Sequence, residues 1–200
     1  MKEFWDKRYA VKEYFYGTHA NHFITTVTDL IINRANILCV GEGEGRNAVF
    51  LARHGFNVTA VDYSVEGKKK ALALANQNKV EIDYQISDLE NFNFGIKKWD
   101  AVVSIFCHLP VEIRADVHKK LEKSLRPSGL FIIQAYNPKQ LEFNSGGPKD
   151  ISMLYDDSML RDDFKNIEWL KLENSLSEIS EGSGHQGLSS VLSGVGRLIT

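Results

Sequence analysis

The sequence predicts an α/β fold in which helices cover both faces of a mostly parallel β-sheet. Between residues 37 and 136, short apolar runs alternate with amphipathic stretches, which is the pattern of βαβ units. The run AVVSIF at 101–106 is apolar except for Ser104, as expected of a central strand that is covered on both faces. The 200 residues suffice for one such domain, whose core needs neither a disulfide nor a metal.

The first half of this region contains three strands and two helices. We expect the strands at 37–40, 57–62 and 80–86, because apolar and β-branched residues dominate each run. Gly55 is a typical C-terminal capping residue for the helix after the first strand, and Ser64 is a typical N-cap for the helix after the second.

The second half continues the alternation. Apolar residues recur every four positions from 111 to 126, which predicts a helix that ends at the Pro-Ser-Gly sequence 127–129. The next strand is expected at 129–136. An irregular stretch and a short helix near 158–164 follow it.

Two strand-like runs close the chain, at 167–179 and 188–199. The segment EGSGHQG joins them, and its glycines suit a β-hairpin connection, so we expect this pair to be antiparallel. A further helix, marked by Phe23, Val27 and Leu30 or Ile31, precedes the first strand.

Composition and charge exclude several classes of function. The 24 Lys and Arg against 26 Asp and Glu give a net charge of −2, so we expect no nucleic acid partner. No run approaches a membrane span and the first residues contain no signal-peptide pattern, so we expect a cytoplasmic protein that does not enter a membrane, as a monomer or homodimer. Cys39, Cys107 and six scattered His residues form no recognisable metal motif.

The strongest local signal is the glycine run in CVGEGEGRN, where a strand turns into a helix. Gly41, Gly43 and Gly45 allow a ligand to approach the backbone, and the helix N-terminus behind them presents unpaired N–H groups. Tight strand-to-helix turns also use glycine, so the run alone is weak evidence for a ligand. The dinucleotide motif GxGxxG would place a glycine where this chain has Arg46, which disfavours a nicotinamide dinucleotide.

Two carboxylates follow neighbouring strands of the predicted sheet. Asp62 ends the second strand, where it can accept both hydroxyls of a ribose, and Asp88 follows the third, within reach of an adenine amino group. Each residue alone is more often a turn or cap residue. Together with the glycine run they mark three consecutive strand ends, and this arrangement favours a nucleoside site.

These segments resemble the motifs of class I S-adenosylmethionine-dependent methyltransferases over about residues 35–136. ILCVGEGEG is similar to the glycine motif, VDYS to the ribose-binding acidic motif, SDLE to the adenine-contacting motif, and SIFCHLP to the segment after the fourth strand. The run GEGRNAVFLARHGFNVTAVD resembles most the small tellurite-resistance and thiopurine-type enzymes.

The resemblance implies a doubly wound, Rossmann-like sheet of seven strands in the order 3214576, mostly parallel with the last strand antiparallel and helices on both faces. It also implies S-adenosylmethionine as the cofactor. The expected cofactor-binding residues are Gly41, Glu42, Gly43, Gly45, Arg46, Asp62, Tyr63, Asp88, Leu89 and Phe106. Cys39 departs from the family, which has an acidic residue at this position to hold the methionine ammonium. Backbone carbonyls and Glu42 are the candidate substitutes.

Candidates for the chemistry at the acceptor lie on the loops after the strands. His108, just past the fourth strand, and His185, in the hairpin connection, are the candidate catalytic bases, with a core and a solvent-exposed role as their respective alternatives. Cys107 is interpreted as a small apolar residue. Tyr16, Asn144 and Gly147 are the candidate substrate residues.

The chain is therefore interpreted as one methyltransferase domain over 1–200. It is divided into an N-terminal lid and helix (1–34), a cofactor-binding core (35–136), and a substrate loop with the C-terminal hairpin (137–200). Because little chain remains beyond the sheet and its helices, we expect a small-molecule methyl acceptor. The alternatives are a methyltransferase for protein or nucleic acid, a dehydrogenase, or a non-catalytic protein that keeps the nucleotide site.

Overall fold

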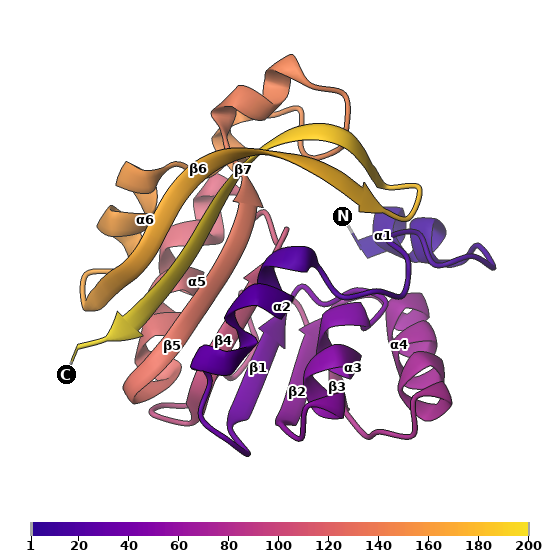
Figure 1. The fold of residues 1–200 in the computed structure, drawn as a ribbon, viewed down its shortest axis with the longest axis horizontal. Coiled ribbons are helices and arrows are strands. Elements are labelled where there is room, and N and C mark those ends of the chain that lie inside the picture. Colours follow the sequence, from indigo (N-terminus) through magenta and orange to yellow (C-terminus); the bar gives the residue numbers. More distant parts are fainter. Residues whose placement is uncertain (1, 200) are drawn as a thin grey trace.

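A seven-stranded sheet in the order β3-β2-β1-β4-β5-β7-β6 runs through the computed structural model, which describes residues 2–199 (Figure 1). The strands are β1 (Asn36–Val40), β2 (Asn57–Asp62), β3 (Asp83–Ile86), β4 (Trp99–Ile105), β5 (Leu125–Tyr136), β6 (Ile167–Glu181) and β7 (His185–Leu198). Neighbours from β3 to β5 are parallel, whereas β7 is antiparallel to both β5 and β6. The predicted order and the antiparallel last strand are confirmed.

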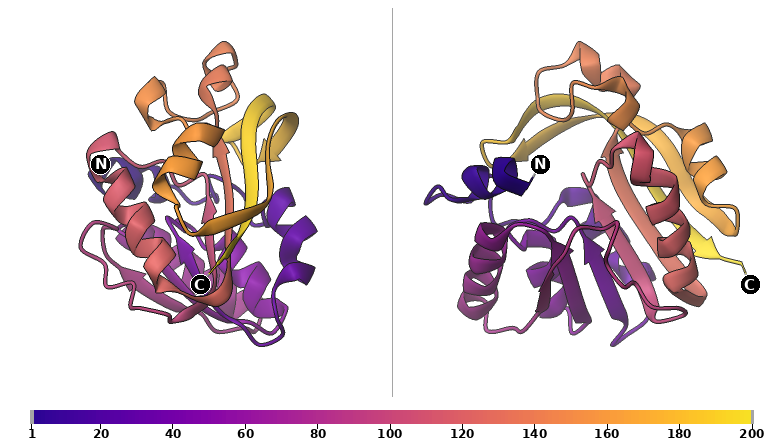
Figure 2. Two further views of the ribbon diagram at one scale, coloured as in Figure 1. Left: turned by 90° about the vertical axis from the view of Figure 1, so that its left-hand side faces the viewer. Right: turned by 180° about the vertical axis from the view of Figure 1, so that it is seen from behind.

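Helices cover both faces of this sheet. The helices are α1 (Lys2–Tyr9), α2 (His22–Val27), α3 (Arg46–Arg53), α4 (Val65–Gln77), α5 (Val111–Ser124) and α6 (Asp157–Asp163). The residues of α2 and α3 pack in one buried cluster, and those of α5 and α6 pack in the other, which lies on the opposite face (Figure 2).

The alternation along β1 divides the core between these two clusters. Ile37 and Cys39 pack with α2 and α3, whereas Leu38 and Val40 pack with α5 and α6. Successive side chains of a strand point to opposite faces, so an uninterrupted apolar run fills both layers. Cys39 is fully buried in the first cluster, and burial raises the pKa of its thiol.

The predicted helix boundaries are confirmed at two capping residues. Gly55 has φ of +84° just after α3. The hydroxyl of Ser64 accepts a hydrogen bond from the Gly67 N–H (3.0 Å) at the start of α4. Both residues satisfy backbone groups that a helix end leaves unpaired.

Several boundaries differ from the sequence prediction: β7 begins at His185 instead of residue 188, so His185 lies in the strand and not in the hairpin connection, and β3 and β5 also begin elsewhere. β3 begins at Asp83 instead of residue 80 and leaves Ile86 exposed, because this edge strand pairs only with four residues of β2, Thr59 to Asp62. β5 begins at Leu125 instead of residue 129, since Leu125 already pairs with Trp99 across an irregularity in β4. Pairing with the neighbouring strand therefore sets where β3 and β5 begin.

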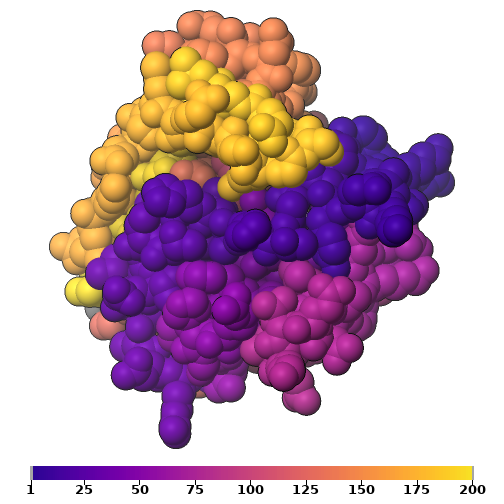
Figure 3. All heavy atoms as spheres, turned by 45° about the vertical axis from the view of Figure 1, so that its right-hand side comes forward, coloured from indigo at the N-terminus to yellow at the C-terminus, as the bar shows by residue number. Residues whose placement is uncertain are grey.

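The β6–β7 hairpin arches over the carboxyl ends of the parallel strands and brings its tip toward α1 (Figures 1 and 2). Gly184 N–H donates to the Phe15 carbonyl (3.0 Å), so the tip contacts the N-terminal segment directly. The space-filling view shows the yellow hairpin tip meeting the indigo N-terminal segment (Figure 3).

Within residues 2–199, no helix has the length and apolar character needed to cross a bilayer. The same residues contain no group of three or more His, Cys, Asp and Glu side chains that is arranged to hold a metal ion.

Candidate functional site

The glycine turn between β1 and α3 has a left-handed backbone at all three glycines. Gly41, Gly43 and Gly45 have φ of +62°, +60° and +89°. The turn is held from β2, where the Val61 carbonyl accepts from Gly41 N–H (2.9 Å), and from β3, where the Tyr84 hydroxyl donates to the Gly43 carbonyl (2.6 Å). Sequence reasoning missed Tyr84, whose role depends on its place in the neighbouring strand.

Asp62 faces this turn from the end of β2, as the sequence predicts. Its carboxylate accepts from Gly43 N–H (3.1 Å) and from Ser64 N–H (2.8 Å). Each carboxylate oxygen can accept more than one hydrogen bond, so both can still accept from a ribose hydroxyl. Burial raises the pKa of Asp62 to about 6, although the backbone N–H groups oppose this shift.

Glu42 has a structural task that the sequence did not reveal. Its Oε1 accepts from Asn47 N–H (3.0 Å) and Ala48 N–H (2.8 Å), so the side chain caps the N-terminus of α3. Burial raises the pKa of Glu42 to about 7 despite these donors. The glycine motif therefore contains a carboxylate, that of Glu42. Cys39, at the position where the family has an acidic residue, packs in the core instead.

Arg46 points to the C-terminal hairpin. Its Nη2 lies 2.7 Å from Glu181 Oε2, and its Nη1 lies 3.4 Å from the Tyr16 carbonyl. Arg46 stays a predicted cofactor-binding residue, and the structure pairs its guanidinium with a carboxylate at the end of β6. The partner could not be inferred from sequence, since 135 residues separate the two.

The remaining residues of the expected cofactor set differ in exposure. Tyr63 is half-buried. Asp88 is exposed, and its Oδ1 accepts from Asn91 N–H (2.8 Å), which is the turn role weighed as its alternative. Leu89 is buried in the core cluster shared with α5. Asp88 keeps a free carboxylate oxygen, whereas Leu89 contributes mainly to packing.

Four rings from distant segments meet where β4 ends. His185 lies 4.4 Å from Tyr16 and 4.6 Å from Phe106, and Phe106 lies 4.6 Å from Tyr136 (ring centroids). Phe106 has φ of +52°, a conformation that bulky residues rarely adopt and that often marks a functional site. The structure therefore brings together Tyr16, Phe106 and His185 from the predicted set.

His185 is buried, which rules out the solvent-exposed alternative for it. Its Nδ1 lies 3.0 Å from Glu181 Oε2, while Nε2 forms no hydrogen bond with the described residues. Burial lowers the pKa of His185 more than the Glu181 carboxylate raises it. The imidazole is therefore neutral at pH 7.

The structure argues against His108 as a base. Its Nδ1 lies 2.7 Å from the Met153 carbonyl, and its Nε2 accepts from Tyr136 N–H (3.2 Å). Both ring nitrogens are engaged with backbone groups, and burial lowers the pKa of His108 to about 4. His108 thus has the core role, in which it connects the segment after β4 to the loop that ends at Met153.

The loop at 143–150 reaches the ring cluster through its glycines. A Cβ built on Gly147 would lie 2.6 Å from the Tyr136 ring, and one built on Gly146 would lie 2.8 Å from the His185 ring. Asn144 is exposed, so its candidacy as a substrate residue is not supported by its position. The buried Ser145 points inward instead and bonds to Gln140 and Ser189.

Comparison with known proteins agrees with this geometry. Residues 37–129 match a family model described as "Methyltransferase domain". This part of the chain is similar to the class I S-adenosylmethionine-dependent methyltransferases. The similarity implies S-adenosylmethionine as the cofactor, and the left-handed turn beside the Asp62 carboxylate fits its nucleoside.

Two curated methyltransferases are similar to this chain. Ubiquinone biosynthesis O-methyltransferase of Rickettsia bellii is 34% identical over 106 residues, which cover 53% of this chain and 44% of that protein. EEF1A lysine methyltransferase 2 of Danio rerio is 29% identical over 163 residues, covering 68% of each. The chain thus spans less than half the length of the first of these relatives.

The solved structure of TehB from Haemophilus influenzae has the same fold. It superposes with a TM-score of 0.74 at 18% identity, covering 98% of this chain and 66% of TehB. The resemblance to the tellurite-resistance type is confirmed at the level of the fold.

The N-terminal helix α1 contacts the start of α4 and the glycine turn. Asp6 Oδ1 accepts from the Ser64 hydroxyl (2.6 Å) and from Val65 N–H (3.0 Å) at the start of α4. Tyr9 is buried, with its hydroxyl beside Gly43. Sequence reasoning predicted an N-terminal lid here but missed Asp6, because a residue that caps a helix 58 positions away has no local signal.

Proposed function

We propose that this chain transfers a methyl group from S-adenosylmethionine to a small-molecule acceptor. The observation that carries the proposal is the left-handed glycine turn facing the Asp62 carboxylate across the ends of β1 and β2. In parallel α/β sheets, ligands bind at the carboxyl ends of the strands. The family match over residues 37–129 supports the same reaction.

The enclosure of the acceptor side favours a small acceptor. The N-terminal segment and the hairpin tip meet over the ring cluster, and Gly184 N–H donates to the Phe15 carbonyl. A protein acceptor would need an open groove that leads to the same rings. The ubiquinone O-methyltransferase relative acts on a small molecule by its name, and the lysine methyltransferase relative keeps a protein acceptor as the second candidate.

The cofactor supplies an electrophilic methyl group on a sulfonium, and the chain has to align the acceptor and exclude water. Tyr16, Phe106 and Tyr136 would provide an apolar wall for this purpose. His185 would take the acceptor's proton through Nε2, since a neutral imidazole can act as a base near pH 7. An acceptor that is already ionised would need His185 only for orientation.

Calorimetry with S-adenosylmethionine, its demethylated product and a nicotinamide dinucleotide tests the cofactor part. We expect micromolar-range binding of the first two and none of the dinucleotide, and the reverse pattern would refute it. A turnover screen of phenols, thiols, oxyanions, amines and a lysine-containing peptide then tests the acceptor. Turnover of the peptide alone would favour the protein methyltransferase.

His185→Gln tests the base on whichever acceptor the screen identifies. We expect turnover to fall on the order of a hundredfold, the usual contribution of general base catalysis, while cofactor binding stays nearly intact. Wild-type turnover in this variant would remove His185 from the chemistry.

A further inference from the structure

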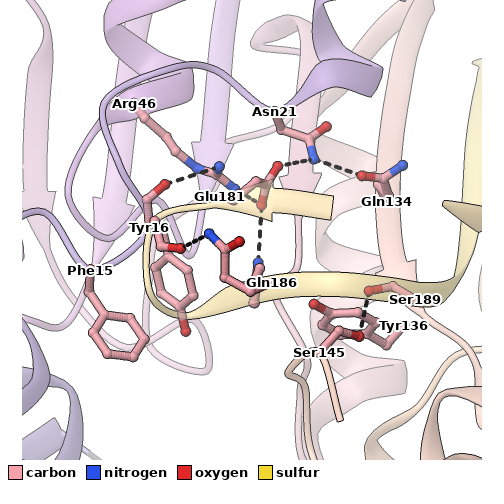
Figure 4. A network of polar contacts seen from close by, with 12 residues as sticks. Phe15, Tyr16, Asn21, Arg46, Gln134, Tyr136, Ser145, Glu181, Gln186 and Ser189 are labelled. Atoms are coloured by element: carbon pink, nitrogen blue, oxygen red, sulfur yellow. Dashed lines mark hydrogen bonds and ion pairs between the residues drawn. The ribbon is translucent and has the colours of Figure 1, made fainter. Parts of the chain in front are cut away.

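Glu181, the last residue of β6, is the centre of a buried polar network (Figure 4). Its Oε2 accepts from Arg46 Nη2 (2.7 Å) and from His185 Nδ1 (3.0 Å), while its Oε1 accepts from Asn21 Nδ2 (2.8 Å). The same Asn21 amide donates to Gln134 Oε1 (2.7 Å) on β5. Contacts from three separate segments thus hold one carboxylate in a single orientation.

We infer that Glu181, paired with Arg46, is the positioning residue for His185: it fixes the imidazole ring and the Nδ1–H tautomer, and so leaves the Nε2 lone pair for the acceptor. The inference rests on the proposed function and deepens it.

The tautomer follows from the ionisation of Glu181. Burial alone would raise the pKa of Glu181, but the hydrogen bond from His185 and the charge of Arg46 outweigh burial and bring it to about 2. An ionised carboxylate only accepts hydrogen bonds, so the proton of a neutral imidazole must be on Nδ1. In a neutral His, the other nitrogen is then the base.

Arg46 balances the charge of this arrangement. A lone carboxylate 3.0 Å from Nδ1 would favour the imidazolium, which has no lone pair to accept a proton. The guanidinium at 2.7 Å from the same oxygen offsets that effect. The titratable or charged groups that face His185 are Glu181 on β6, Arg46 on α3, Arg8 on α1, Tyr16 on the N-terminal segment, Tyr136 on β5 and His108 after β4.

The network also connects His185, the proposed base, to the glycine turn on the expected cofactor side. Arg46 is the first residue of α3 and directly follows Gly45 of the glycine turn. A solvent groove of about 380 Å³, bordered by Tyr16, Asn21 and Glu181, reaches the network from the side of α2. Glu181 therefore lies between this groove and the imidazole.

Nitrogen-15 NMR of the His185 ring in the cofactor-free protein tests the inference without any turnover. We expect wild type to show the Nδ1–H tautomer. Glu181→Gln should lower the Nδ1–H population and the His185 pKa, because the charge that raises this pKa is gone. Glu178→Gln, an exposed carboxylate three residues earlier on the same strand, should leave both unchanged. An unchanged tautomer and pKa in Glu181→Gln would overturn the inference.

Glu181→Asp provides a second variant that keeps the charge, in case Glu181→Gln does not fold. Its shorter carboxylate should retain the Nδ1–H tautomer with a weaker effect on the pKa. A ring that switches tautomer in Glu181→Asp, although the variant is folded and the carboxylate is ionised, would also contradict a positioning role based on charge.

Turnover measurements distinguish a failure of this inference from a failure of the proposed function. We expect Glu181→Gln to lower kcat by about tenfold to a hundredfold, the range for residues that orient a functional His. KM and cofactor affinity should change little, and the pH limb of kcat should move to lower pH. Loss of activity in His185→Gln with a wild-type rate and pH profile in Glu181→Gln would overturn only the positioning role. Wild-type activity in His185→Gln would overturn the proposed base itself.

Discussion

The thiol of Cys107 lies against Gly41, so the ends of β1 and β4 touch through a glycine and a cysteine. A Cβ built on Gly41 would lie 2.5 Å from the Cys107 Sγ and 2.9 Å from its Cβ. Residue 41 also has φ of +62°, which non-glycine residues adopt only with strain. Cys107 thus acts as a small packing residue at the site, and burial raises the pKa of its thiol to about 12.

Gly41→Ala should therefore destabilise the fold and weaken cofactor binding. The left-handed backbone alone costs of order 1–2 kcal/mol for an alanine, and the contact with Cys107 adds to this cost. Gly55→Ala is the matched control, because Gly55 has φ of +84° with no atom near its Cβ position. Urea unfolding should show a larger loss for Gly41→Ala, and equal losses would mean that the Cys107 contact is unimportant.

Asp62→Asn should weaken S-adenosylmethionine binding while the protein remains folded. The amide oxygen can still accept from one backbone N–H, but the charged acceptor is lost, and hydrogen bonds to charged groups are worth roughly 1.5–3 kcal/mol. Calorimetry would measure the change. Asp83→Asn, an exposed carboxylate on the adjacent β3, should bind like wild type. An unchanged dissociation constant for Asp62→Asn would exclude Asp62 from the cofactor site.

Asp6→Ala should release α1 from the start of α4. The carboxylate accepts from the Ser64 hydroxyl and from Val65 N–H, and losing a comparable helix cap costs about 1 kcal/mol. Amide hydrogen exchange in residues 2–10 should accelerate. Glu3→Ala, an exposed substitution on the same helix, should not change the exchange. Equal protection in both variants would show that apolar packing alone holds α1.

Glu42 should make stability depend on pH. Because burial raises its pKa from 4.5 to about 7, the folded state binds a proton more tightly than the unfolded chain between these values. The contribution of Glu42 to stability therefore falls as the pH rises through this window. Glu42→Gln has no charge to bury. Its free energy of unfolding, relative to that of wild type, should therefore rise between pH 4.5 and 7.5 by up to about 3 kcal/mol.

Urea unfolding of the cofactor-free proteins at both pH values measures this difference. Asp62, which titrates in the same direction with a pKa of about 6, is present in both proteins and cancels. A difference between Glu42→Gln and wild type that does not change with pH would show that Glu42 keeps an ordinary pKa.

The strands were predictable because each carries its pattern locally. The apolar run of β4 and the alternation that divides β1 between two core clusters need no knowledge of the rest of the chain. The errors occur where pairing decides the boundary. β3 is an edge strand whose pairing with β2 begins only at Asp83, opposite Thr59, and β5 starts early because Leu125 pairs with Trp99.

In the site, too, the features that depend on local sequence were predictable, and those that depend on tertiary contacts were not. Gly41 and Asp62 could be brought together from sequence, since the carboxyl ends of adjacent parallel strands meet at one edge. The counterion of Arg46 could not be inferred, because Glu181 is on a hairpin that follows four further strands. His108 and His185 were equal candidates until hydrogen bonds occupied both nitrogens of the first and one of the second.

The sequence by itself determined the α/β class, the strand order that its family resemblance implied, and the nucleoside-binding edge. Periodicity and glycine spacing are local properties, and parallel strands align their ends automatically. Only the tertiary structure decided which His keeps a free nitrogen and which carboxylate holds it. The physical reason is that hydrogen-bond partners and desolvation are set by contacts such as that between Glu181 and Arg46, which chain folding brings together across 135 positions.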